Sequence, residues 1–128
     1  MTSRISHTTV DCANAYQLSL FWAAVLGYAQ DPENPDEPGD EECMIFGSDS
    51  AMPLLFIEVP EGKQAKNRLH LDLRPIDRTQ SEEIERVLAL GGVEVEDRRT
   101  TEGGWMVIAD PEGNEFCILR SDSEIAGS

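Results

Sequence analysis

The chain repeats one pattern of residues at an offset close to half its length. The strand-like segments Ile5–Asp11 and Arg68–Arg74 each lead into a helix-like stretch that ends in a Leu-Gly pair. The Leu-Gly pairs are 64 positions apart (from 26 to 90), and His7 and His70, the only histidines, are 63 positions apart. A shared offset predicts two copies of one structural unit, each presenting one imidazole from the same point of its first strand.

The first half is predicted to form a strand, a helix and three further strands. In the alternating strand 5–11, His7 and Thr9 share one face. Asn14 suits the start of the helix and Gly27 its end. An apolar stripe at helical spacing lies between them, made of Leu18, Phe21, Trp22 and Val25. The remaining predicted strands are 28–30, 43–47 and 54–59.

An acidic segment, residues 31–42, interrupts this half with three prolines, one glycine and seven acids. Such a composition predicts a mobile surface loop. Its spacing matches no calcium-binding loop, so we interpret the acids as a solvated surface.

The second half repeats the same order of elements. In the predicted strand 69–74, His70 and Asp72 alternate with leucines that we expect to face helices. Ser81, with Glu83 or Glu85, is a loose capping signal for the next helix. The other predicted elements are the helix 79–90, the strands 93–96, 105–109 and 116–120, and a frayed tail over 121–128.

Composition restricts the class of protein. A chain of 128 residues forms one domain with a hydrophobic core, which we place over residues 1–128. The net charge of −15 argues against nucleic acid and anionic membranes, because both need a basic face. No run of residues approaches the length of a membrane span.

The N-terminus and the cysteines predict a cytoplasmic protein. Residues 1–4 contain no apolar signal region and lead directly into a strand. Cys12, Cys43 and Cys117 are an odd number of cysteines without a short metal-type spacing. Free thiols in this arrangement suit a reducing cytosol.

Several features in order resemble the vicinal oxygen chelate superfamily, which includes glyoxalase I, extradiol dioxygenases, and the fosfomycin and bleomycin resistance proteins. The features are two βαβββ units, a strand histidine opening each, a Leu-Gly pair after each helix, and Asp-Pro-Glu-Gly-Asn (110–114) before the last strand. The stretches 66–73 and 110–117 look most like the glyoxalase-like domain proteins of that superfamily. The resemblance covers residues 5–119, nearly the whole chain.

The resemblance implies an α+β fold in which two βαβββ modules, about 4–60 and 66–120, form a partly closed barrel-like cleft. Many members of the superfamily are dimers, so it also implies a homodimer. Some members build each site from one chain and others from two, and both arrangements stay open here.

The resemblance also implies a divalent metal. Catalytic members hold the ion with side chains from the opening and last strands of the modules, and His7 and His70 fall on the opening-strand positions. Glu58, near the end of the first module, is a third candidate ligand. Neutral imidazole suits Zn, Ni, Mn or Fe(II). The competing interpretation is a pair of polar histidines held by hydrogen bonds in a wet cleft.

The sequence departs from the superfamily pattern at the fourth ligand. Counting from the 110–114 turn places Cys117 where metal-binding members carry Glu. A thiolate binds Zn or Fe but is a softer ligand, so it changes the expected chemistry. Either Cys117 is a ligand, or Glu115 on the same strand face reaches in, or the site has decayed.

The remaining candidate residues are predicted to contact a small-molecule ligand. Thr9 shares the face of His7, and Asp72 shares the face of His70. Asp72 either orients that ring, binds substrate, or pairs with a neighbouring arginine. Trp105 is either an aromatic wall for the ligand or a core residue.

Three functions follow as hypotheses. The first is a metal-dependent lyase, isomerase or dioxygenase that acts on vicinal oxygens, with Glu58 or Glu115 as the catalytic proton carrier. The second is a ligand-sequestering protein of the bleomycin-resistance kind, which the acidic charge favours for a cationic drug. The third is a partner-binding domain without a ligand. Fold alone does not choose among them.

Overall fold

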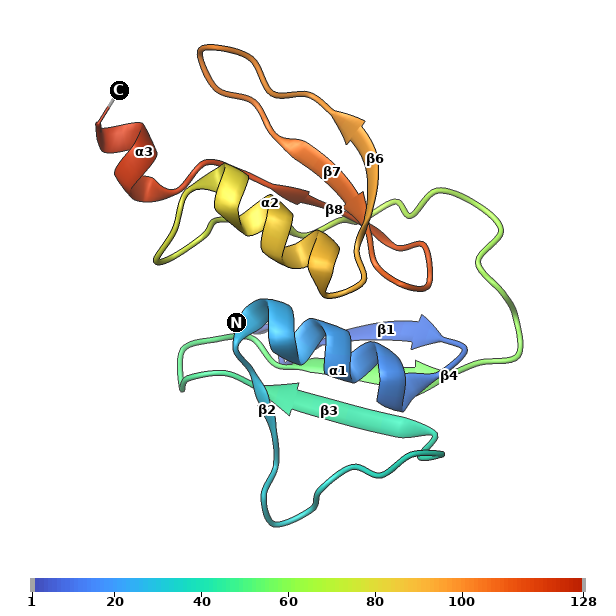
Figure 1. The fold of residues 1–128 in the computed structure, drawn as a ribbon. Coiled ribbons are helices and arrows are strands. Elements are labelled where there is room, and N and C mark those ends of the chain that lie inside the picture. The colour runs from blue at the N-terminus through green and yellow to red at the C-terminus, as the bar shows by residue number, and fades with distance from the viewer. Residues whose placement is uncertain (1, 128) are drawn as a thin grey trace. The chain divides into compact units, whose positions relative to one another are not determined.

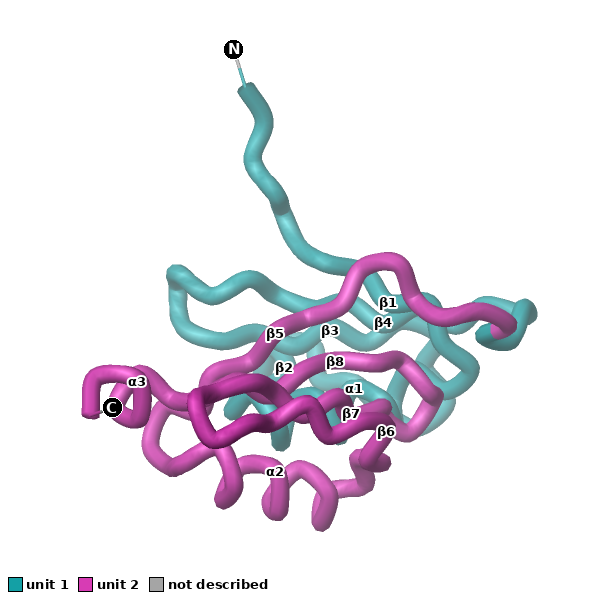
Figure 2. Tube along the Cα trace, turned by 90° about the horizontal axis from the view of Figure 1, so that it is seen from above, with its two compact units in different colours: residues 1–63 teal, residues 64–128 magenta. Residues whose placement is uncertain are grey.

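The computed structural model describes residues 2–127, and the chain divides into two compact units, Met1–Lys63 and Gln64–Ser128 (Figures 1 and 2). Each unit contains one four-stranded sheet and the helix that follows its first strand. The α+β fold of two βαβββ modules is therefore confirmed. Within residues 2–127, no strand pairing joins the two sheets into one closed barrel.

The N-terminal unit follows the predicted order of elements. Its elements are β1 (Thr8–Cys12), α1 (Ala15–Leu26), β2 (Ala29–Gln30), β3 (Glu42–Phe46) and β4 (Leu54–Glu58). The strand order is β1-β4-β3-β2, with β1 parallel to β4 and the other pairs antiparallel. The first strand begins at Thr8 rather than Ile5, because the register with β4 starts where Thr8 lies opposite Leu54.

Helix α1 forms where its caps and apolar stripe predicted it. Asn14 accepts a hydrogen bond from the Gln17 N–H at 3.0 Å, and Gly27 ends the helix with φ of 70°. The predicted stripe is buried, comprising Leu18, Phe21, Trp22 and Val25. This face packs on β3 and β4 and supplies the core of the unit.

Cys43 lies in that core and gives the folded state a pH dependence. Burial raises the pKa of its thiol to about 11, helped by the negative charges of Asp36 and Asp40. A thiol with a raised pKa in the folded state stabilises the fold fully below its unfolded pKa. That contribution is lost as the pH rises from about 9 to about 11.

We therefore expect the free energy of unfolding of Cys43→Ala to depend less on pH in the alkaline range than that of the wild type. Between pH 9 and 11 the wild-type free energy of unfolding should fall by about 1–2 kcal/mol more than that of the variant. Urea unfolding at several pH values measures the difference. Parallel curves for the two proteins would contradict this expectation.

The C-terminal unit has the same order of elements followed by an additional helix. The elements are β5 (Asp72–Leu73), α2 (Gln80–Ala89), β6 (Val93–Asp97), β7 (Met106–Ala109), β8 (Glu115–Ile118) and α3 (Asp122–Ala126). The strand order is β5-β8-β7-β6, with β5 parallel to β8 and the other pairs antiparallel.

Helix α2 begins with a capping box different from the expected signal. The Thr79 hydroxyl accepts from the Glu82 N–H, and the Glu82 carboxylate accepts from the Thr79 N–H at 2.8 Å. Neither Ser81–Glu83 nor Ser81–Glu85 forms this box. The buried Gln80 amide donates to the carbonyls of Gly104 and Ile118, which ties the helix start to the sheet.

Two further expectations for this unit were wrong. The predicted strand 69–74 is reduced to Asp72–Leu73, and Leu69 is 90% exposed, so its leucines do not form one buried face. The expected frayed tail instead contains α3, because Ser121 and Glu124 form a second capping box. Ser128 lies outside the described residues.

Alternation along β8 separates the core from the opposite face of the sheet. Phe116 and Ile118 are almost completely buried, and α2 contacts β8. Glu115 and Cys117 point to the other face because successive strand residues alternate. No helix among residues 2–127 is long and apolar enough to cross a membrane.

Candidate functional site

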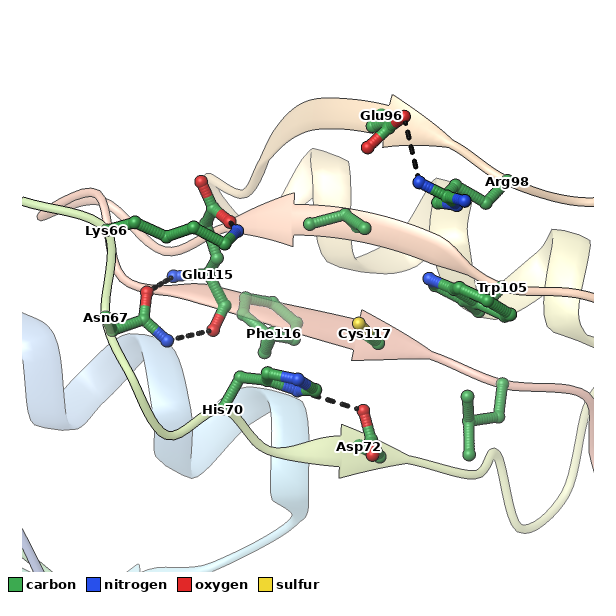
Figure 3. Close-up of a pocket in the computed structure, with 12 residues that line it drawn as sticks. Lys66, Asn67, His70, Asp72, Glu96, Arg98, Trp105, Glu115, Phe116 and Cys117 are labelled. Carbon is green, nitrogen blue, oxygen red and sulfur yellow. Dashed lines mark hydrogen bonds and ion pairs between the residues drawn. The ribbon is translucent and has the colours of Figure 1, made fainter.

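A cavity of about 390 Å³ opens on the face of the C-terminal sheet that carries Glu115 and Cys117 (Figure 3). Strands β5 to β8 and the segment before β5 supply its walls. The cavity is lined by Lys66, Asn67, His70, Asp72, Glu96, Arg98, Trp105, Val107, Glu115, Phe116, Cys117 and Leu119. All of these residues belong to the C-terminal unit.

Strand register builds the floor of this cavity as a row across all four strands. Asp72 lies opposite Cys117, Cys117 opposite Val107, and Val107 opposite Glu96. Residues opposite one another in a sheet project to the same face. Positions far apart in the sequence therefore become neighbours in one row, which has a carboxylate at each end and the side chains of Cys117 and Val107 between them.

Three side chains with different donor atoms meet at one end of the row. The His70 Nδ1 atom lies 3.2 Å from a carboxylate oxygen of Asp72. One potential ligand atom from each of His70, Asp72 and Cys117 lies within 4.8 Å of the others. The side chains of His70 and Asp72 are about half exposed, whereas Cys117 is buried. Three roles were expected for Asp72. Its position beside His70 fits the first of them, which is to orient the imidazole ring.

The environment of Cys117 keeps its sulfur protonated when no cation is bound. Burial raises the pKa of the thiol, and the nearby Asp72 carboxylate raises it further. Cys117 is therefore poorly suited to act as a free thiolate nucleophile. A cation that replaces the proton would remove this penalty.

Glu115 is held at the edge of the cavity by the segment before β5. Its carboxylate pairs with the Lys66 ammonium, and this hydrogen bond raises the pKa of Lys66. The Asn67 amide accepts from the Glu115 N–H at 3.0 Å and donates to the Glu115 carbonyl at 3.2 Å. Asn67 thus bonds to β8 as a neighbouring strand residue would.

Trp105 forms an aromatic wall of the cavity. Its ring is 39% exposed, so it lies outside the core. The Arg98 guanidinium lies 5.4 Å from the ring centroid, within cation–π range, and also pairs with Glu96 at 3.3 Å. The Arg98 N–H donates to the Trp105 carbonyl at 2.9 Å, which keeps the two residues opposite each other.

The other predicted site residues belong to the N-terminal unit. His7 precedes β1, and its Nδ1 atom lies 2.9 Å from the Ser6 hydroxyl. Thr9 is an exposed residue of β1. Glu58 accepts a hydrogen bond from the Ala15 N–H at 3.1 Å, at the start of α1. The joint action of His7 with His70 stays a prediction.

Sequence reasoning did not identify Lys66, Asn67, Glu96 or Arg98 as cavity residues. Alternation along β6 was not a usable signal, because the pairing register with β7 shifts between Glu94 and Glu96 and the period-two pattern breaks there. No local pattern indicates that Asn67 bonds to β8, since the contact joins segments 48 positions apart.

The model of the glyoxalase-like domain family matches residues 7–119. The chain belongs to this family. The match spans both modules and every predicted site residue. No curated protein sequence is similar enough to count as a relative.

Solved structures share the fold of this glyoxalase-like protein. A fosfomycin resistance protein, FosX, from Listeria monocytogenes was crystallised as a glutamate-to-glutamine mutant with Mn(II) and 1S,2S-dihydroxypropylphosphonic acid. It is 18% identical, with a TM-score of 0.70 over 97% of this chain and 94% of that chain. FosX from Mesorhizobium loti is 15% identical, with a TM-score of 0.70 over 100% of both chains.

A third structure extends the comparison to the broader superfamily. A glyoxalase/bleomycin resistance protein/dioxygenase family enzyme from Burkholderia phytofirmans is 14% identical, with a TM-score of 0.71 over 91% of this chain and 97% of that chain. The match to the glyoxalase-like domain family confirms the resemblance to the vicinal oxygen chelate superfamily, and these structures agree with it in fold. At these identities the structures establish the fold, while the activity must be argued from the cavity.

Proposed function

We propose that this glyoxalase-like protein binds a small molecule in the cavity of its C-terminal unit and uses a divalent metal there to act on two neighbouring oxygens. The observation that carries the proposal is the meeting of His70, Asp72 and Cys117 at the cavity floor. One potential ligand atom from each of the three residues lies within 4.8 Å of the other two, so the three side chains could hold one ion.

A bound divalent ion would supply Lewis acidity toward vicinal oxygens, which suits lyase, isomerase or dioxygenase chemistry. His70 would donate nitrogen, with Asp72 fixing the ring. Glu115 is the proposed proton acceptor, since its carboxylate lines the same cavity. Trp105 would exclude water from one side of the ligand.

The superfamily resemblance adds residues of the N-terminal unit to this proposal. His7 would be a second imidazole ligand, Glu58 a further ligand or proton carrier, and Thr9 a contact to substrate. We also propose that the protein works in the cytoplasm, where its buried cysteines would stay reduced, and that it forms a homodimer, as the superfamily resemblance implies.

A specific observation favours a second function, ligand sequestration without catalysis. Cys117 occupies the position where metal-binding members of the superfamily carry Glu, while the Trp105 wall persists. The net charge of −15 would attract a cationic ligand of the bleomycin type. In this alternative the cavity binds by stacking and charge, and His70 is a hydrogen-bonding residue.

Metal analysis of the purified protein and of His70→Ala tests the proposal. We expect about one equivalent of metal after incubation with Zn, Ni, Mn or Fe(II), and an affinity at least ~100-fold lower in His70→Ala. Glu94→Gln, an exposed strand position, is the matched control and should bind as wild type. Diketones, hemithioacetals and catechols are then the substrates to screen.

The opposite result also has a defined meaning. If no ion binds and His70→Ala changes nothing, metal-dependent chemistry is excluded. In that case Trp105→Ala should weaken the binding of a cationic aromatic ligand by roughly 10-fold, measured by isothermal titration calorimetry.

A further inference from the structure

We propose that His70, Asp72 and Cys117 supply nitrogen, oxygen and sulfur ligands to one metal ion in the C-terminal unit, and that the sulfur ligand selects borderline-soft ions such as Zn(II) or Co(II). This inference rests on the proposed function, because it requires that the cavity takes a divalent metal. It adds Asp72 as a ligand, makes Cys117 the residue that determines metal class, and places three ligands in one unit.

The sheet explains why these three residues converge. Parallel pairing of β5 with β8 places Asp72 directly opposite Cys117. His70 precedes Asp72 by two positions and lies on the same side, as the 3.2 Å approach of the two side chains requires. The Cys117 N–H donates to the Leu71 carbonyl at 2.9 Å, which fixes the short strand against β8 at this point.

Figure 3 shows the three side chains near one another on the cavity floor, where His70 comes from the segment before β5, Asp72 from β5 and Cys117 from β8. Cys117 is 7% exposed, so a cation reaches it only from the cavity side. A site with three protein ligands and an open cavity leaves a position for water or substrate, as catalytic zinc sites do.

The chemistry of the donors selects the metal class. Thiolate sulfur prefers Zn and other borderline-soft ions, whereas Mn and Mg prefer carboxylate and water oxygens. Binding forms a sulfur–metal bond, breaks the S–H bond and releases its proton to solvent, so no oxidant or reductant is needed. The expected preference therefore differs from the Mn(II) held by the Listeria monocytogenes FosX structure.

Cobalt spectroscopy tests the sulfur ligand directly. Titration of the full chain with Co(II) should produce a near-ultraviolet sulfur-to-metal charge-transfer band that saturates at one equivalent and is abolished by one equivalent of Zn(II). Cys117→Ser should lose this band. Asp72→Asn should weaken Co(II) binding by at least ~10-fold while keeping the band at saturation.

The chain offers a matched control at Cys43. This buried strand cysteine also lies near two carboxylates, Asp36 and Asp40, so Cys43→Ala tests the alternative thiol cluster. We expect the charge-transfer band to be unchanged in Cys43→Ala. Far-ultraviolet circular dichroism confirms folding, and Cys117→Ala serves as the second variant if Cys117→Ser does not fold.

Competition between ions measures the metal preference. The ratio of Zn(II) to Mn(II) affinity should fall at least ~10-fold in Cys117→Ser and further in Cys117→Glu, which restores a carboxylate. A band that survives Cys117→Ser, or one lost in Cys43→Ala, would overturn the sulfur-site inference. Metal that binds through His70 with no charge-transfer band would also overturn it while leaving the proposed function intact. Absence of all metal binding would remove both.

Discussion

Asp110→Ala is expected to lower the free energy of unfolding by about 3 kcal/mol, because a buried carboxylate organises the turn before β8. Asp110 is 1% exposed and accepts hydrogen bonds from the Glu112 and Asn114 N–H groups at 2.9 and 3.0 Å. The Asn114 side-chain amide also donates to it. Alanine would leave these donors without their acceptor inside the fold. Urea unfolding at neutral pH measures the change.

Asp31→Ala is the matched control for this substitution. Asp31 accepts a similar local hydrogen bond, from the Glu33 N–H at 2.9 Å, but in an exposed loop where water replaces the lost acceptor. We expect an effect below about 0.5 kcal/mol there. Equal losses in the two variants would show that burial is not the cause.

Gly104→Ala is expected to destabilise the β6–β7 hairpin and to disturb the cavity wall at the same time. Gly104 has φ of 95°, and a Cβ atom there would lie 2.3 Å from the Arg98 carbonyl oxygen. The left-handed backbone conformation and the clash with the Arg98 carbonyl oxygen together should lower the free energy of unfolding by at least about 2 kcal/mol. Trp105 is the next residue after Gly104. A shift of the hairpin backbone that relieves the clash would therefore also move the Trp105 ring relative to the Arg98 guanidinium.

Two measurements separate the effects of this substitution. Thermal unfolding reports the loss of stability, and a changed tryptophan emission in the folded protein reports the displaced ring. Gly62→Ala is the control, since a Cβ at that position has no heavy atom within 4 Å. A Gly104→Ala protein with wild-type stability and emission would disprove the predicted clash.

The sequence was sufficient to predict features determined by local chemistry or by the repeat. The offset between the halves predicted two equal modules, and the Asn14 and Gly27 caps predicted α1. The 110–114 turn was also predicted, because its Pro and Gly stand at positions that suit a tight turn. The caps of the second and third helices were missed, although the sequence contains the capping-box patterns Thr-x-x-Glu at 79 and Ser-x-x-Glu at 121.

Features that depend on pairing over long distances were not predictable in the same way. The alternating leucines of 69–74 favoured a long strand, yet only Asp72 and Leu73 pair with β8. Asp72 and Cys117 are neighbours only because of the register between β5 and β8, in which residues 45 positions apart in the chain lie opposite each other. Alternation predicts which face a residue occupies, but register decides which residues it meets there.

Because the side chains of β8 alternate between two faces of the sheet, the residues that line the cavity can change without changing the residues that form the core. Phe116 and Ile118 bury the core, while Glu115 and Cys117 between and beside them face the cavity. A substitution at 117 can therefore replace one donor atom by another while the apolar contacts of its two neighbours are kept. If Cys117 is the proposed sulfur ligand, one substitution at this position would change the class of metal ion that the protein binds, and the core of the sheet would stay as it is.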